Sequence, residues 1–183
     1  MTILPREFYS KDTVTVARNL LGKKIIRKIG RYEISGIITE TEAYRHKDDP
    51  ASHAFGRITD RNRVMFGQVG LAYVYFTYGM YFCFNVVAKS PKTKAGAVLI
   101  RAITPEKGIN IMQENRGNVE IKNLSNGPAK LAQALAITKE DYGTDLTKKS
   151  KLYIVEGVKP KKITSSPRIG ISKAVDKLWN FKI

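Results

Sequence analysis

Two carboxylates and a tyrosine alternate along one short stretch of the chain, Glu40-Thr41-Glu42-Ala43-Tyr44. Side chains two residues apart in a strand point to the same face, so Glu40, Glu42 and Tyr44 are expected on one side of a sheet. Two carboxylates on one buried face are costly unless they are paired or take part in chemistry. The stretch is therefore a candidate for general acid or base catalysis, and a salt-bridged strand end is the other interpretation that the residues allow.

Aromatic side chains gather in a second region, where seven of them fall within twelve positions: Tyr73, Tyr75, Phe76, Tyr78, Tyr81, Phe82 and Phe84. We predict that Phe76, Phe82 and Phe84 pack in the core of a hairpin. Tyr78 is different, because it stands before Gly79 in a tight-turn signal and should project outward. An exposed aromatic ring at the tip of a hairpin could enter a stack of nucleobases.

The charge of the chain is strongly positive, with 32 Lys and Arg against 16 Asp and Glu and a formal net charge of +16 at pH 7. Such an excess favours polyanionic partners, which are DNA, RNA or an anionic membrane surface. A basic ribosome-associated protein would explain the charge, but it would not explain the paired carboxylates.

The sequence carries no signal for secretion, membrane insertion or a bound cofactor. Residues 1–6 have too short an apolar stretch for a signal peptide, and no apolar run approaches the ~20 residues of a membrane helix. The single cysteine, Cys83, can form no intramolecular disulfide, which fits a reducing compartment. The two histidines, His46 and His53, match no usual zinc-ligand spacing, and no Walker-type phosphate loop is present. We therefore expect an intracellular protein that needs no metal, no cofactor and no membrane.

The elements that would position these residues follow from hydrophobic periodicity, helix caps and turn residues. Helices are expected from Ser10, as the capping residue, to Gly22, over 106–113 and over 127–137. Strands are expected over 23–29, 32–44, 71–77, 80–89, 97–103, 151–155 and 168–172, with a long polar loop over 45–63. We predict one mixed α/β (α+β) domain that spans residues 1–183 and has mainly antiparallel strands.

Several motifs follow one another in the order typical of a known family. They are Ile38-Thr39-Glu40-Thr41-Glu42-Ala43-Tyr44, then His53, Arg61-Asn62-Arg63-Val64-Met65-Phe66, Tyr73-Val74-Tyr75-Phe76-Thr77-Tyr78-Gly79-Met80-Tyr81-Phe82-Cys83-Phe84-Asn85, Val98-Leu99-Ile100-Arg101-Ala102 and Gly127-Pro128-Ala129-Lys130-Leu131-Ala132-Gln133-Ala134-Leu135. In these motifs the chain resembles the alkyladenine (3-methyladenine) DNA glycosylase family. The approach to the hairpin departs from the family pattern, because Gln68-Val69-Gly70 lacks the proline expected before the glycine.

The resemblance implies a single-domain fold with a curved sheet and a protruding β-hairpin. It implies a monofunctional enzyme of base excision repair that uses water, without a metal or a cofactor. Its partner would be double-stranded DNA that contains damaged purines, such as 3-methyladenine, 7-methylguanine, hypoxanthine and ethenoadenine. The enzyme would flip the base, hydrolyse the N-glycosidic bond and leave an abasic site. A monomer is expected, in the cytoplasm with the nucleoid in a bacterium or in the nucleus in a eukaryote.

The resemblance also assigns roles to individual residues. Glu42 matches the general base that activates water, and Arg101 matches a residue that helps hold the water and the nucleotide. The flipped base would be surrounded by the residues that match its binding pocket, which are Tyr44, His53, Tyr75 and the purine-selecting Asn85. Tyr78 matches the intercalating side chain, with Met80 beside it.

Other functions explain part of the pattern. A catalytically silent DNA- or RNA-binding module would account for the charge and for an exposed Tyr78, but not for Glu42 beside Tyr44. A bifunctional glycosylase-lyase would need a lysine or N-terminal amine as nucleophile, and Lys130 lies early in a predicted helix. A purely structural interpretation of Asn85 is that its buried amide forms a hydrogen bond with a neighbouring backbone group.

Overall fold

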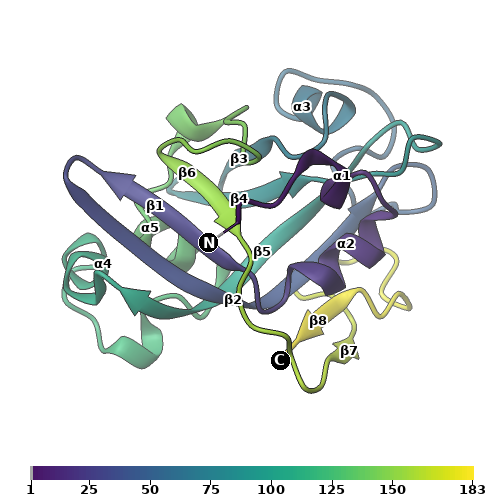
Figure 1. Ribbon diagram of the computed structural model, residues 1–183. Helices are drawn as coiled ribbons and strands as arrows, with labels where there is room; N and C mark the ends of the chain where they lie inside the picture. The colour runs from purple at the N-terminus through teal and green to yellow at the C-terminus, as the bar shows by residue number, and fades with distance from the viewer. Residues whose placement is uncertain (1) are drawn as a thin grey trace.

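The computed structural model describes residues 2–183, and its centre is a curled antiparallel sheet (Figure 1). The main path through the sheet has the order β3-β4-β5-β2-β1-β6, and β8 pairs with both β2 and β7. The strands are β1 (Lys24–Ile29), β2 (Tyr32–Arg45), β3 (Ala72–Thr77), β4 (Tyr81–Val87), β5 (Gly96–Lys107), β6 (Leu152–Val155), β7 (Thr164–Ser166) and β8 (Asn180–Lys182). The expected mixed α+β class with a mainly antiparallel sheet is confirmed.

Strand β2 lies in the middle of this sheet. One of its edges pairs with β5, while the other pairs with β1 up to Ile37 and with β8 from Glu40 to Glu42. The register of the β2–β5 ladder shifts on both sides of Glu40, which marks a bulge. The two carboxylates of the Glu40–Glu42 stretch therefore lie in the centre of the sheet rather than at a free strand end.

Helices border the sheet at several points. They are α1 (Arg6–Tyr9), α2 (Thr13–Leu20), α3 (Arg63–Phe66), α4 (Ile109–Asn115) and α5 (Pro128–Ala134), with short 3₁₀ turns at Ile121–Asn123 (η1) and Lys139–Asp141 (η2). One connected hydrophobic core joins α2, α4 and α5 to the strands, through residues such as Leu20, Ile38, Phe84, Met112 and Leu131. Within residues 2–183, no helix is long and apolar enough to cross a membrane.

Three local expectations were wrong. The cap of α2 is Asp12 rather than Ser10, because the Asp12 carboxylate accepts hydrogen bonds from the free N–H groups of Val14 and Thr15. The expected helix over 106–113 begins only at Ile109, because β5 continues to Lys107. Phe76 is 49% exposed instead of buried, because the hairpin extends beyond the core there and the ring packs against Phe82.

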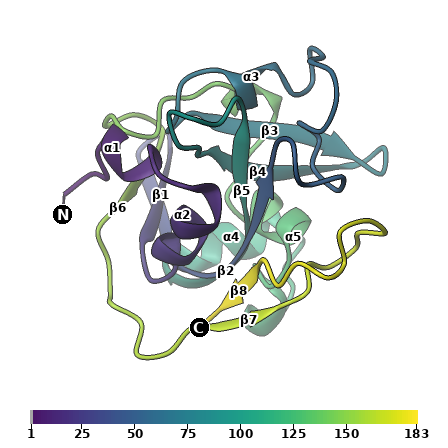
Figure 2. The same cartoon turned by 90° about the vertical axis from the view of Figure 1, so that its right-hand side faces the viewer.

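The expected strand over 168–172 is also absent from the structure, where residues 167–171 have neither helical nor strand conformation. They belong to the connection between β7 and β8. Figure 2 shows this connection and the tip of the β3–β4 hairpin projecting on the same side of the molecule. That side carries the candidate site.

Candidate active site

A cavity of about 380 Å³ opens on this side of the protein. Its walls come from β2, the β3–β4 hairpin, β5, the loop over 45–63 and the connection before β8. The lining residues include Tyr44, His53, Arg61, Tyr73, Tyr75, Tyr78, Cys83, Asn85, Leu99, Arg101 and Ile169. The volume lies within the ~300–1,000 Å³ typical of small-ligand pockets.

The Glu42 carboxylate lies directly behind the wall of this cavity and is 0% exposed. Its Oε1 accepts hydrogen bonds from the backbone N–H of Ile169 at 2.8 Å and from Asn180 Nδ2 at 2.9 Å. Its Oε2 accepts one from the Tyr44 hydroxyl at 2.8 Å and a longer one from Arg101 Nη1 at 3.4 Å. A carboxylate has about four acceptor positions, so three short contacts and one longer one hold this carboxylate in a single orientation. Glu42 does not itself line the cavity, but Tyr44, Arg101 and Ile169 do.

Glu40 shares two of these partners. Its Oε1 accepts hydrogen bonds from Arg101 Nε and Asn180 Nδ2, both at 2.8 Å, and it lies 3.3 Å from Lys182 Nζ. Burial acts to raise the pKa of Glu40, but the hydrogen bonds from Asn180 and Arg101 and the charges of Arg101 and Lys182 hold it below its ordinary value. The shared partners confirm that Glu40 and Glu42 lie on one face. Arg101 forms an ion pair with both carboxylates, with the shorter contact to Glu40, which also pairs with Lys182.

The tyrosine of the same stretch acts as a donor to the carboxylate. Burial raises the pKa of the Tyr44 hydroxyl, and the negative charge of Glu42 raises it further. The phenol therefore stays protonated at neutral pH, so it can donate to Glu42 Oε2. Its ring lines the cavity, so Tyr44 connects the carboxylate to whatever occupies that space.

Aromatic rings form the opposite wall. His53 Nδ1 lies 2.8 Å from the Tyr73 hydroxyl oxygen, and the rings of His53 and Tyr75 meet edge to face with centroids 4.6 Å apart. Burial, and then the positive charge of Arg61, lower the pKa of His53 below its ordinary value. His53 is therefore neutral at pH 7. The Arg61 guanidinium lies 5.0 Å from the centroid of the Tyr75 ring.

Asn85 lies on β4 opposite Tyr73 of β3. Its side chain is 2% exposed, lines the cavity and donates a hydrogen bond from Nδ2 to the Tyr73 carbonyl oxygen at 3.0 Å. The hydrogen bond to a backbone group that the structural interpretation of Asn85 expects is therefore present. Among residues 2–183, the amide oxygen and the second N–H have no hydrogen-bond partner, and the contact with Tyr73 fixes how the amide is turned.

The tip of the hairpin confirms the expected turn. Tyr78 and Gly79 both have positive φ angles, 51° and 69°, as a tight hairpin turn requires. Tyr78 is 85% exposed and also lines the mouth of the cavity, while Met80 is 63% exposed and does not line it. Two bulky side chains thus stand in solvent beside the opening.

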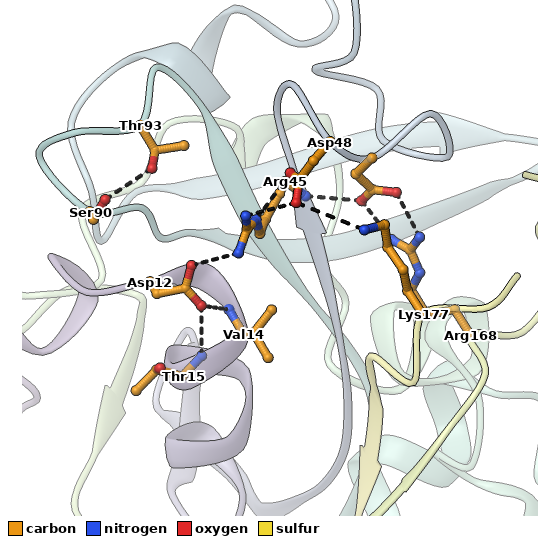
Figure 3. A network of polar contacts seen from close by, with 10 residues as sticks. Asp12, Val14, Thr15, Arg45, Asp48, Ser90, Thr93, Arg168 and Lys177 are labelled. Carbon is orange, nitrogen blue, oxygen red and sulfur yellow. Dashed lines mark hydrogen bonds and ion pairs between the residues drawn. The ribbon is translucent and has the colours of Figure 1, made fainter. Parts of the chain in front are cut away.

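Three contributors to the site carried no recognisable signal in the sequence: Ile169, Asn180 and the ion pair of Arg168 with Asp49. Ile169 and Asn180 reach Glu42 from 127 and 138 residues away in the chain, and Arg168 reaches Asp49 from 119 residues away, so no local pattern connects them. Figure 3 shows Arg168 and Lys177, from the connection before β8, reaching the loop that follows β2. Beside them, the last residue of β2, Arg45, binds Asp12 and Asp48.

Comparisons with known proteins show the family to which this chain belongs. The model of the methylpurine-DNA glycosylase (MPG) family matches residues 7–183. A relative from Carboxydothermus hydrogenoformans is 48% identical over 181 residues, covering 98% of this chain and 94% of that protein. Relatives from Clostridium acetobutylicum and Ehrlichia chaffeensis are 44% and 46% identical, covering 98% and 99% of this chain and 93% of each of those proteins. Each of the three bears the name "Putative 3-methyladenine DNA glycosylase". The resemblance of the motifs is thereby confirmed, and the chain belongs to the methylpurine-DNA glycosylase family.

Proposed function

We propose that this protein is a monofunctional DNA glycosylase that draws a damaged purine out of duplex DNA and hydrolyses its N-glycosidic bond. The observation that carries the proposal is a buried carboxylate, Glu42, fixed by four donors directly behind the wall of an aromatic cavity. A base inside a duplex cannot be reached by such a group, so the nucleotide must first be extruded. The products would be a free purine and an abasic site.

The cavity suits damaged purines of several shapes, which would be 3-methyladenine, 7-methylguanine, hypoxanthine and ethenoadenine. Tyr44, His53 and Tyr75 offer ring faces and edges, and every purine has a π-face that can stack on them. In DNA, 3-methyladenine and 7-methylguanine carry a positive charge, which favours contact with tyrosine faces. A neutral His53 adds no charge that would repel such a base, because its pKa is lowered.

Glu42 would activate the attacking water. The contact of Arg101 Nη1 with Glu42 Oε2 is the longest of the four at 3.4 Å, so we propose that the attacking water displaces this contact and binds Glu42 Oε2 in its place. An alkylated base is already a good leaving group, so one carboxylate can suffice where sugar hydrolases use two. The carboxylate takes the proton of the water, and its charge favours the positive charge that develops on the sugar.

Tyr78 would take the place of the extruded nucleotide. Its ring is exposed at the tip of a hairpin beside the cavity mouth, and Met80 stands next to it. A side chain inserted in the base stack opposes the return of the flipped base and kinks the duplex. Tyr78 and Met80 are therefore the proposed contacts with the interior of the stack.

Asn85 would discriminate among purines by their 2-amino group. Its Nδ2 is held by the Tyr73 carbonyl oxygen, so the amide cannot turn freely to accommodate a new substituent. Guanine carries a 2-amino group that hypoxanthine lacks. A fixed amide near that edge would clash with the amino group of guanine or leave it unpaired. 7-Methylguanine pays the same penalty, but its N-glycosidic bond is weak because the base is cationic, and this compensates for the penalty.

The lyase alternative is less well supported. Lys130 Nζ is bonded to the Asn126 side chain at 2.8 Å and does not line the cavity, and none of the residues found to line it is a lysine. Borohydride should therefore trap no covalent adduct between protein and DNA. A trapped adduct would identify an amine nucleophile and would overturn the role of water.

The net charge of +16 supports duplex DNA as the partner, and we propose that a monomer binds it.

The direct test of the proposed activity is to incubate the protein with a duplex that contains a single hypoxanthine. The proposal expects free hypoxanthine and an abasic site, detected by mass spectrometry and by strand cleavage in alkali. A protein that binds the duplex and releases no base from it, nor from duplexes with 3-methyladenine, 7-methylguanine or ethenoadenine, would be a silent binding module instead.

A further inference from the structure

Behind the cavity, Asp49 and Arg168 form an ion pair in which both side chains are fully buried. The pair is bidentate, with Nη1–Oδ2 and Nη2–Oδ1 distances of 2.6 Å each. Arg168 Nη1 also donates to the Ala43 carbonyl oxygen at 2.9 Å, and Asp49 accepts from the backbone N–H of Arg45 at 3.0 Å. The pair thus ties the connection before β8 to the end of β2.

This ion pair touches the proposed catalytic groups on two sides. The Arg168 guanidinium lies 4.6 Å from the centroid of the Tyr44 ring, whose hydroxyl donates to Glu42 Oε2. The next residue, Ile169, donates its backbone N–H to Glu42 Oε1. Arg168 is therefore linked to both oxygens of the Glu42 carboxylate. Its guanidinium contacts the ring of Tyr44, which binds Oε2, and its neighbour in the chain, Ile169, binds Oε1.

The segment that carries Arg168 has few other attachments. Within the described residues 2–183, the backbone of 167–173 makes no hydrogen bond to another backbone group, and residues 167–171 belong to no helix or strand. The Ile169 side chain is half-exposed. Arg168 is consequently the buried anchor that determines where the Ile169 N–H points.

A buried ion pair is poor evidence for stability as such, because removing two charges from water costs much of what their attraction returns. The chain contains a second pair that shows what a purely structural example looks like. Arg27 of β1 binds Asp141 of η2 at 2.6 Å and the Ala136 carbonyl oxygen at 2.9 Å, and neither Arg27 nor Asp141 lines the cavity. Asp49 and Arg168 do not line the cavity either, but of these two pairs only theirs adjoins groups that hold the Glu42 carboxylate, which are the Tyr44 ring and the Ile169 N–H.

We infer that Asp49 and Arg168 are positioning residues, which orient Glu42 through the Ile169 N–H and the Tyr44 ring and touch neither base nor DNA themselves. The inference rests on the proposed function, since it concerns the geometry of the same hydrolysis. A shift of about 1 Å in a reacting group can cost about 100-fold in rate, so release of this segment should act on the chemical step. Duplex binding should change little, because the pair is buried.

The test compares Arg168→Lys with Arg27→Lys, which both keep the charge and lose the planar guanidinium. Single-turnover excision of hypoxanthine gives the maximal rate and the half-saturating protein concentration separately. We expect Arg168→Lys to lower the maximal rate about 100-fold at unchanged half-saturation, and Arg27→Lys to keep the wild-type rate even though its melting temperature falls. An equal rate loss in both variants, or a change confined to half-saturation, would overturn the inference.

A second variant covers the case in which Arg168→Lys does not fold. In Asp49→Leu/Arg168→Met the pair is replaced by apolar side chains, a type of change that often leaves stability intact. A folded double variant with a maximal rate about 100-fold below wild type supports positioning, and a wild-type rate refutes it. If the wild-type protein itself excises no damaged purine, the proposed function fails; if it does and these variants match it, only the positioning role fails.

Discussion

Replacing Asn85 with alanine should let the cavity accept purines that carry a 2-amino group. The substitution removes the fixed amide and opens space beside the Tyr73 carbonyl oxygen. We propose that this space faces the purine edge where hypoxanthine has a hydrogen and guanine an amino group. Exclusion of one such group by a shaped pocket is worth about 1–3 kcal/mol, which corresponds to roughly 10- to 200-fold in rate. The ratio of 7-methylguanine to hypoxanthine excision should rise by that factor.

The stability cost of Asn85→Ala can be worked out separately. The Tyr73 carbonyl oxygen loses its bond from Nδ2, and a buried group that loses its partner costs about 1–3 kcal/mol. For a chain of 183 residues, each kcal/mol lowers the melting temperature by roughly 2–4 °C, so a decrease of about 2–12 °C is expected. The variant should remain folded at 25 °C, where the excision rates are measured.

The assay uses single-turnover rates on two duplexes that differ only in the damaged base. Asn115→Ala is the matched control, because Asn115 Nδ2 also donates to a backbone carbonyl oxygen, that of Ala134, at 3.0 Å, and Asn115 lies outside the cavity. The control should lose stability and keep the wild-type ratio. An unchanged ratio in folded Asn85→Ala, or an equal rise in Asn115→Ala, would refute the role of Asn85 in selectivity.

Three further outcomes follow from the same site. Tyr78→Ser should slow excision from paired duplex more than excision of a mismatched lesion, because an unpaired base costs less to extrude; equal loss on both substrates would point to a role in folding. The affinity for undamaged duplex should fall with salt at a log–log slope of about −5 if about 6 phosphates are neutralised, and titrations at several salt concentrations that give a flat line would contradict phosphate binding. Burial and the charge of Arg61 lower the pKa of His53, so the unfolded chain takes up the proton first as the pH drops below about 6.5. The stability associated with His53 is therefore fully present above that pH and declines below it. In thermal melts, the melting temperature of His53→Gln should fall less steeply between pH 6.5 and 5 than that of the wild type. An equally steep fall would assign the acid sensitivity to other groups.

Most of the secondary structure could be predicted because its signals are local. A run rich in Ile and Thr identifies β2, the Tyr78-Gly79 pair identifies the hairpin turn, and Pro128 identifies the first turn of α5. The cap of α2 was assigned to Ser10 rather than Asp12, because both residues are good caps and only the folded geometry selects between them. Local rules thus predict which elements exist more reliably than where they begin.

The candidate site also contains residues that local motifs predict and residues that they do not. Tyr44, His53, Tyr75, Asn85 and Arg101 were named from motifs, and the structure brings all of them to one cavity. The donors that fix Glu42 were not predicted, because Ile169 contributes a backbone N–H, which any residue type could supply. The Asp49–Arg168 pair was missed for a second reason, since the apolar flanks of Arg168 favoured a strand where the structure has an irregular connection.

The most direct test of the account is the excision rate of Glu42→Gln on a hypoxanthine duplex. Glutamine keeps the length of the side chain but cannot take a proton from water, so the variant should bind the damaged duplex and release no free base. Glu40→Gln is the control, because Glu40 shares Arg101 and Asn180 with Glu42 and has no proposed proton-transfer role. The account predicts a far smaller loss for Glu40→Gln than for Glu42→Gln. Release of hypoxanthine at the wild-type rate by folded Glu42→Gln would contradict the central claim.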